Sequence, residues 1–180
     1  MTYRPLVVPI ADLRRHPGAR RQFTESVELP GLAITSATVP DGASINLDLE
    51  LETLSNGLVA TGSIATPWVG ECRRCLQPVE GRSVAQIREI FEPRPVEGET
   101  YAMAEDIVNL EPMVRDAVLL ALPLAPLCAA DCRGPAPELF PARVAGEGEE
   151  SEEEEGPGLI SDPRWAALAE LDFEPGDLGE

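Results

Sequence analysis

The chain has 180 residues with 32 acidic and 14 basic side chains, all of the basic ones arginine, and its formal net charge is −18 at pH 7. Residues 145–180 hold 13 acids and one arginine and so contribute −12 of that charge. This distribution argues against unaided binding to duplex nucleic acid and favours a basic partner, such as a ribosomal protein or a histone-like chain. No signal peptide and no apolar stretch near the roughly 20 residues of a membrane span is present, so we expect a soluble cytoplasmic protein.

The N-terminal segment predicts a short strand at residues 6–10 and a helical turn at residues 11–15, which ends before Pro17. Four arginines flank this turn, namely Arg14, Arg15, Arg20 and Arg21. They are a candidate contact patch for RNA phosphates or for a partner, although a solvated loop in a chain without lysine explains them as well. His16, inside the same basic loop, is expected to be solvated rather than catalytic.

Strand patterns dominate the middle of the chain. Apolar residues alternate with polar and acidic ones over residues 45–52, which indicates a strand with one buried face. The turn signal Ser55-Asn56-Gly57 leads into a second strand at residues 58–68, where Gly62 is expected to mark a bulge. Residues 79–91 fit a helix or a bulged strand, and the hairpin context favours a strand. Residues 92–100 read as a loop.

One main helix is predicted at residues 109–122, with Asn109 as its N-cap and Pro123 as its stop. Its apolar positions form one continuous stripe, made of Leu110, Met113, Val114, Ala117, Val118 and Ala121. We expect this stripe to pack on the sheet. The fold class is therefore α+β, with a small antiparallel sheet or partial barrel packed by one main helix over residues 1–134.

The C-terminal region is expected to consist of two parts. Residues 135–161 are rich in Pro, Gly and Glu and predict an acidic disordered linker. Residues 162–172 predict a short amphipathic helix with Trp165, Leu168 and Leu171 on one face. Docking of that helix on its own domain is the default expectation, and binding to a partner is the alternative.

All four cysteines occur in two closely spaced pairs, Cys72 with Cys75 and Cys128 with Cys132. Thiols at these spacings, in a reducing compartment, are typical of one tetrahedral metal site, and zinc is its usual occupant. Arg73 and Arg74 are expected to lower the thiol pKa values. A metal bound by all four cysteines would fasten the sheet to the end of the helix.

Two other interpretations of the cysteines stay open, a thiol redox couple at Cys72 and Cys75 or four buried free thiols. The redox version usually lies at a strand-to-helix junction, whereas strand-like sequence follows this pair. Other catalysis finds little support, because the chain has no phosphate-binding or dinucleotide-binding glycine motif and its densest acidic cluster lies in the tail. We therefore expect a protein that is not an enzyme and has no small-molecule substrate.

Several segments, taken in order, resemble the YceD-like family of large ribosomal RNA subunit accumulation proteins. Residues 71–79 are similar to its C-x-R-C-L-x-P-V motif, and residues 106–123 to its I-D-L…V-R-E…L-A-L-P segment. Residues 127–134 are similar to its L-C…C-x-G segment, residues 13–18 to the L-R-R-P-G of its high-GC Gram-positive members, and residues 162–168 to its C-terminal helix.

This resemblance implies a bacterial cytoplasmic factor in large ribosomal subunit biogenesis, which supports accumulation or processing of the 23S rRNA. Its partner would be a basic large-subunit ribosomal protein, the precursor rRNA, or both. Many relatives carry two further cysteines after the second pair, where this chain has Pro135-Ala136-Pro137 instead. The remaining four thiols are thus the only complete ligand set for a metal.

Overall fold

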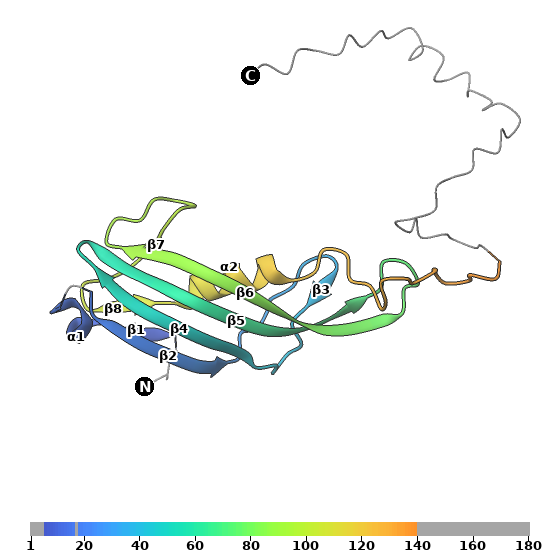
Figure 1. The fold of residues 1–180 in the computed structure, drawn as a ribbon, viewed down its shortest axis with the longest axis horizontal. Coiled ribbons are helices and arrows are strands. Elements are labelled where there is room, and N and C mark those ends of the chain that lie inside the picture. The colour runs from blue at the N-terminus through green and yellow to red at the C-terminus, as the bar shows by residue number, and fades with distance from the viewer. Residues whose placement is uncertain (1–5, 17, 140–180) are drawn as a thin grey trace, which may run out of the picture. The chain divides into compact units, whose positions relative to one another are not determined.

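The structure is a computed structural model that describes residues 6–16 and 18–139 (Figure 1). The acidic linker beyond residue 139 and the C-terminal helix expected at 162–172 lie outside the described residues. Sheet dominates the fold, and the elements in chain order are β1 (Val7–Pro9), α1 (Ala11–Arg14), β2 (Arg20–Val27), β3 (Ala37–Thr38), β4 (Ile45–Leu54), β5 (Gly57–Glu71), β6 (Pro78–Glu92), β7 (Tyr101–Ala102), β8 (Ile107–Asn109) and α2 (Glu111–Ala121).

The main sheet has six strands in the order β2-β4-β5-β6-β7, with β3 paired to β5 off this path. All of its pairings are antiparallel except the short one between β6 and β7. The β5–β6 hairpin is its longest element, with paired residues running from Leu58 and Phe91 to Glu71 and Pro78. A separate two-stranded sheet joins β1 to β8.

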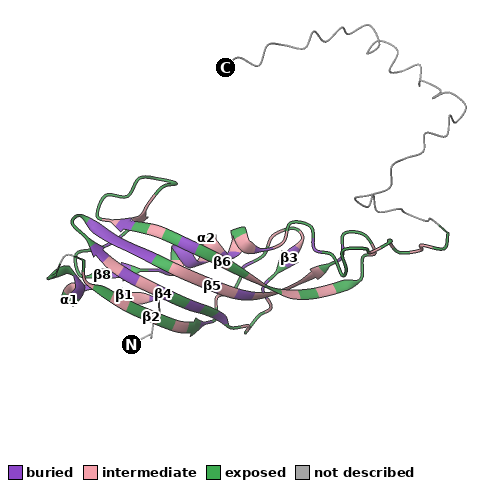
Figure 2. Ribbon diagram, in the orientation of Figure 1, coloured by how far each residue is buried: buried purple, intermediate pink, exposed green. Residues whose placement is uncertain are grey.

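Strict alternation along β4 fixes which face of the sheet is buried. Its apolar residues Ile45, Leu47, Leu49 and Leu51 are at most 1% exposed, whereas the polar residues between them lie on the outer face (Figure 2). Because side chains alternate in a strand, this pattern puts one row of leucine and isoleucine into the core. The strand expected at residues 45–52 is confirmed.

A second layer covers the buried face. It consists of β1, β8, α1 and α2, whose apolar residues belong to the same core cluster as those of β4 to β6. The backbone N–H of Ile10 donates to Asp106 O at 2.8 Å and that of Leu110 donates to Leu6 O at 2.8 Å, so β1 and β8 are held together at both ends. The result is a two-layer α+β domain.

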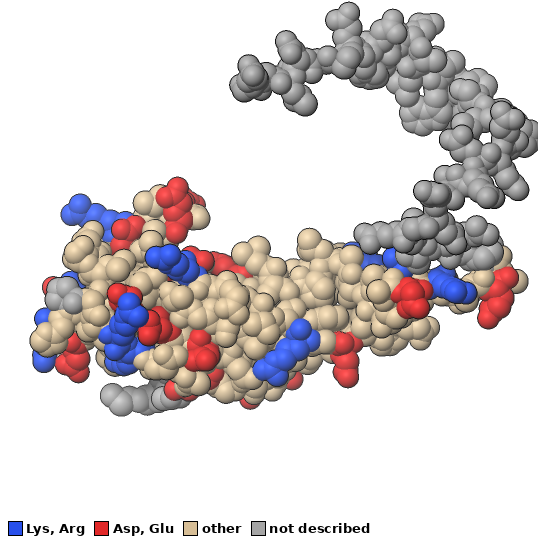
Figure 3. Space-filling view, viewed as in Figure 1, with Lys and Arg blue, Asp and Glu red and all other residues tan. Residues whose placement is uncertain are grey.

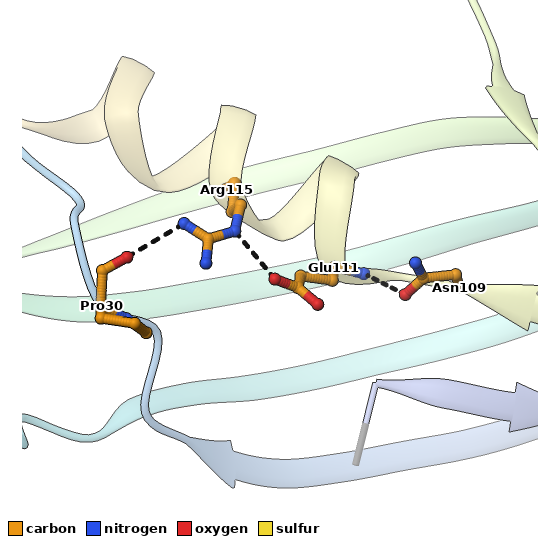
Figure 4. Close-up of polar contacts among 4 residues, drawn as sticks. All are labelled: Pro30, Asn109, Glu111 and Arg115. Atoms are coloured by element: carbon orange, nitrogen blue, oxygen red, sulfur yellow. Dashed lines mark hydrogen bonds and ion pairs between the residues drawn. The ribbon is translucent and has the colours of Figure 1, made fainter. Parts of the chain in front are cut away.

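Helix α2 is fixed by polar contacts at its N-terminal half (Figure 4). Asn109 Oδ1 accepts a hydrogen bond from the backbone N–H of Glu111 at 3.1 Å. Arg115 pairs with Glu111 at 2.9 Å and donates to the carbonyl of Pro30 at 3.1 Å, which ties the helix to the loop after β2. None of the helices among the described residues is long and apolar enough to cross a membrane.

The bulge expected at Gly62 is wrong. Its register in the β4–β5 pairing continues without a break, with Gly62 opposite Leu49. Gly62 has φ +150°, and a Cβ there would lie 2.1 Å from the carbonyl oxygen of Asp48. The glycine is therefore required by a close approach of two backbones within a regular ladder, rather than by an extra residue.

Candidate metal centre

The two cysteine pairs meet at the far end of the β5–β6 hairpin. Cys72 follows the last residue of β5, and Cys75 lies in the turn that leads into β6. Cys128 and Cys132 lie in the loop that follows α2. The junction of sheet and post-helix segment expected from the sequence is confirmed at this point.

Backbone hydrogen bonds shape the hairpin turn. The N–H of Cys72 donates to Gln77 O at 2.8 Å, and the N–H of Leu76 donates to Cys72 O at 2.9 Å. Leu76 has φ +61°, a left-handed conformation at the end of the turn, and the next residue, Gln77, pairs with Cys72. The N–H of Arg73 donates to Pro126 O at 2.9 Å, which joins this turn to the loop after α2.

The four sulfur atoms form a compact cluster. Cys72 Sγ lies 3.8 Å from Cys132 Sγ, and Cys75 Sγ lies 3.6 Å from Cys128 Sγ. All four lie within 4.8 Å of one another. A tetrahedral ion with metal–sulfur bonds of about 2.3 Å separates its sulfurs by about 3.8 Å, whereas a disulfide needs about 2.05 Å. The cluster therefore has the size of a metal site, and its cysteines are not oxidised in pairs.

Backbone amides favour the thiolate form of Cys72. The N–H groups of Cys75 and Cys128 hydrogen-bond to its sulfur and lower its pKa to about 6, although burial opposes the shift. Hydrogen bonds with the thiols of Cys132 and Cys75 raise the pKa of Cys128 to about 12. For Cys75 the Gln77 amide lowers the pKa, but burial and neighbouring thiols outweigh it and the net direction is upward. The thiolate of Cys72, which these amides favour, is the form that binds a metal.

Arg74 has a different role from the one its charge suggests. The sequence predicts that the guanidinium groups of Arg73 and Arg74 lower the thiol pKa values, but the main causes at Cys72 are backbone N–H groups. Arg74 Nη1 instead donates to the carbonyls of Ala130 and Cys132 at 2.9 and 3.0 Å. These hydrogen bonds hold the second cysteine pair against the first. The spacing of the cysteines in the sequence does not reveal this role of Arg74.

Substitution of Arg74 by alanine should weaken metal binding roughly tenfold without changing the stoichiometry, because positioning partners of metal ligands typically matter by 10- to 100-fold. Competition with a chromogenic chelator measures the affinity. Arg73→Ala is the matched control, because the Arg73 side chain makes no hydrogen bond or ion pair within the described part of the chain. Equal losses in the two variants would contradict a specific role for Arg74.

The four arginines of the candidate contact patch all have partners within the chain. Arg14 donates to Glu105 O, and Arg15 pairs with Asp12 at 3.3 Å. Arg20 bridges Glu50 and Glu52 on the outer face of the sheet, at 3.2 and 3.1 Å, and Arg21 donates to Pro9 O at 2.8 Å. Figure 3 shows acidic side chains interspersed with the basic ones at the end of the molecule that carries α1. A contact with phosphates here stays a prediction.

Comparisons with known proteins give one family model and several relatives. The profile described as "Large ribosomal RNA subunit accumulation protein YceD" matches residues 60–172. Uncharacterized proteins of Mycobacterium tuberculosis and Mycobacterium bovis are 35% identical over 175 residues, which covers 93% of this chain and 81% of each relative. An uncharacterized protein of Mycobacterium leprae is 32% identical over 176 residues, covering 93% of this chain and 77% of the relative. No solved structure matches the chain significantly.

Proposed function

The chain belongs to the family of YceD large ribosomal RNA subunit accumulation proteins, and on this premise we propose that it is a non-enzymatic factor in large ribosomal subunit biogenesis. It supports accumulation or processing of the 23S rRNA by binding a basic ribosomal protein. The observation that carries the proposal is the family match over residues 60–172, which includes the first cysteine pair, α2, the second pair and the C-terminal segment.

The charge of the chain supports a basic protein as the direct partner. Residues 145–180 carry −12, which is attractive to a cationic protein and repulsive to RNA. Of the two patch arginines on β2, Arg20 lies against Glu50 and Glu52 of β4, and Arg21 donates to Pro9 O. This pairing reduces the positive potential that an RNA site needs. Contact with precursor rRNA through this patch is therefore the less favoured route.

Zinc is the metal we propose for the four-cysteine cluster. Soft thiolate ligands in a tetrahedral set favour zinc over the harder divalent cations. Four protein ligands complete the coordination of the ion and leave no open position, so the metal would be structural. It would fasten the end of the β5–β6 hairpin to the loop after α2, where few core residues lie.

The redox alternative at Cys72 and Cys75 is less well supported by the geometry. The pKa of Cys72, about 6, lies in the range of reactive thiols, but its side chain is 0% exposed. An attacking thiol needs access to its substrate. A strand, β6, follows the pair instead of a helix. A ligand of a structural metal needs no such access, so the burial of Cys72 favours metal ligation.

A tagged full-length protein, purified from the bacterium that carries the gene, tests the ribosomal role. We expect enrichment of large-subunit ribosomal proteins together with precursor large-subunit rRNA, measured by mass spectrometry and RNA sequencing. RNase treatment before elution separates the two routes, because a directly bound protein survives it. A pull-down that contains no ribosomal material would overturn the proposal.

Neutralising the tail tests the electrostatic part of the proposal. Seven glutamates between residues 147 and 155, changed to glutamine, would reduce the tail charge from −12 to −5. We expect about tenfold weaker binding of the basic partner at low ionic strength and a weaker salt dependence. Titrations at two salt concentrations measure both. The matched control changes seven exposed acids of the folded part to their amides, namely Glu28, Asp41, Glu97, Glu99, Glu105, Asp106 and Glu138. An equal loss in this control would show that net charge rather than the tail determines affinity.

A further inference from the structure

Strand β6 presents a long open edge. On one side it pairs with β5 along its whole length, from Pro78 to Phe91. On the other side its ladder with β7 involves only Phe91 and Glu92. Among the described residues nothing else pairs with residues 78–90, so their outward N–H and C=O groups form a template for another strand.

The side chains on the outer face of this edge combine charge with apolar surface. The exposed residues alternate along the strand as Glu80, Arg82, Val84, Gln86, Arg88 and Ile90. Val84 is 56% exposed and Ile90 is 42% exposed. Natural edge strands are usually blunted by charge, proline or a bulge, and here Val84 occupies the middle of the edge instead.

We propose that β6 pairs antiparallel with β6 of a second copy of this chain, about a two-fold axis at Val84. In this register Val84 faces its own counterpart. Glu80 then lies opposite Arg88 of the second copy, and by symmetry Arg88 lies opposite the second copy's Glu80. Directly opposed residues in an antiparallel pair have Cβ atoms about 5 Å apart, so both charge pairs form across the interface.

Neighbouring registers lack this complementarity. An axis at Ala85 would put Arg82 opposite Arg88 of the second copy, and like charges directly opposite each other destabilise a strand pair. An axis at Gln86 would put Glu80 opposite Glu92 of the second copy. The charge sequence of the edge therefore selects the axis at Val84, as an isologous dimer requires.

The groove beside the edge fits the same partner. A depression of about 280 Å³ lies between β6 and α2, and its lining includes Ala85, Ile87, Ala117 and Leu120. Leu120 is 87% exposed. Because the axis at Val84 is perpendicular to the sheet, both α2 helices lie on one face of the joined sheet. Each groove would then face its symmetry mate across the axis, and the dimer would bury apolar surface that the single chain leaves open.

Charge reversal on the full-length, metal-loaded protein tests this dimer. Sedimentation equilibrium should give twice the chain mass of 19.3 kDa. Arg88→Glu and Glu80→Arg should each raise the dimer dissociation constant about tenfold or more, because two attractive pairs become repulsive. The double variant carrying both changes should restore dimerisation to within about threefold of the unsubstituted protein. Arg82→Glu is the matched control, since Arg82 faces only Gln86 of the second copy, and it should change the constant less than about threefold.

Three results would overturn the proposal. The first is a monomer at all concentrations up to about 100 µM. The second is a dimer that Arg88→Glu does not weaken more than Arg82→Glu does, which would place the interface elsewhere. The third is a double variant that stays as weak as its parents while its circular dichroism and melting temperature match those of the unsubstituted protein. Neither charged side chain is buried, so the variants are expected to fold.

Discussion

Replacing Cys72 with serine will abolish stoichiometric metal binding and lower the melting temperature by about 10 °C. A ligand that binds only the folded state stabilises it by about 4 kcal/mol when its free concentration exceeds the dissociation constant about 1,000-fold. In a domain of this size each kcal/mol shifts the melting temperature by roughly 2–4 °C. Cys72 is the thiol to change because its side chain is fully buried within the cluster. Metal content by atomic emission and melting by circular dichroism measure the two effects.

The control for this variant is Asp131→Ser, an exposed position between Cys128 and Cys132 in the same loop. It should keep one metal per chain and its melting temperature. A chelator should lower the melting temperature of the unsubstituted protein to that of the Cys72 variant, and should leave the variant unchanged. If the unsubstituted protein melted at the same temperature with and without chelator, the metal would contribute nothing to folding.

The sequence was most informative where one face of an element is buried completely. Strand β4 is visible from alternation, since the core admits only apolar side chains at every second position. Its partner β5 is visible from the turn signal Ser55-Asn56-Gly57 that precedes it. The four metal-site cysteines are visible because a tetrahedral site needs short spacings within each pair. The structure brings both pairs together at the predicted junction.

Elements that are held mainly by tertiary contacts could not be predicted from the sequence. Strand β2 alternates only between exposed and half-buried residues over most of its length, so its periodicity carries little apolar signal. Strands β7 and β8 have two and three residues, too few for any period. Arg20 and Arg21 look like part of a basic loop, yet they begin β2 and their charges meet Glu50, Glu52 and the carbonyl of Pro9. Contacts between strands determine these short strands and arginine pairings. A local sequence pattern carries no information about such contacts.

The cysteine cluster depends on the sheet that carries it. Cys72 continues directly from β5, and β5 is the only strand of the described residues that pairs with β3, β4 and β6. Any change that separates β5 from β4 therefore affects the strand on which the first cysteine pair is mounted. Gly62 lies opposite Leu49 in this pairing, where an added Cβ would meet the backbone of β4.

Gly62→Ala should lower the free energy of unfolding by about 3–5 kcal/mol, among the largest effects of a single methyl group in this protein. The new Cβ would lie 2.1 Å from Asp48 O and 2.9 Å from the Cα of Leu49. Both neighbours are backbone atoms of a central strand, so they cannot rotate away as a side chain would. The positive φ of +150° adds a conformational penalty of its own. Urea denaturation followed by tryptophan fluorescence gives the difference, since Trp68 packs against the core.

Gly98→Ala is the reference for this destabilisation. Gly98 also has a positive φ, +79°, but a Cβ there meets nothing within 4 Å. Its substitution measures the backbone penalty alone, and we expect about 1 kcal/mol. The excess at Gly62 then contains the steric conflict with β4 and the larger backbone penalty of φ +150°. Equal effects at the two glycines would mean that the strands can separate at little cost. The close backbone contact would then not be the reason for glycine at position 62.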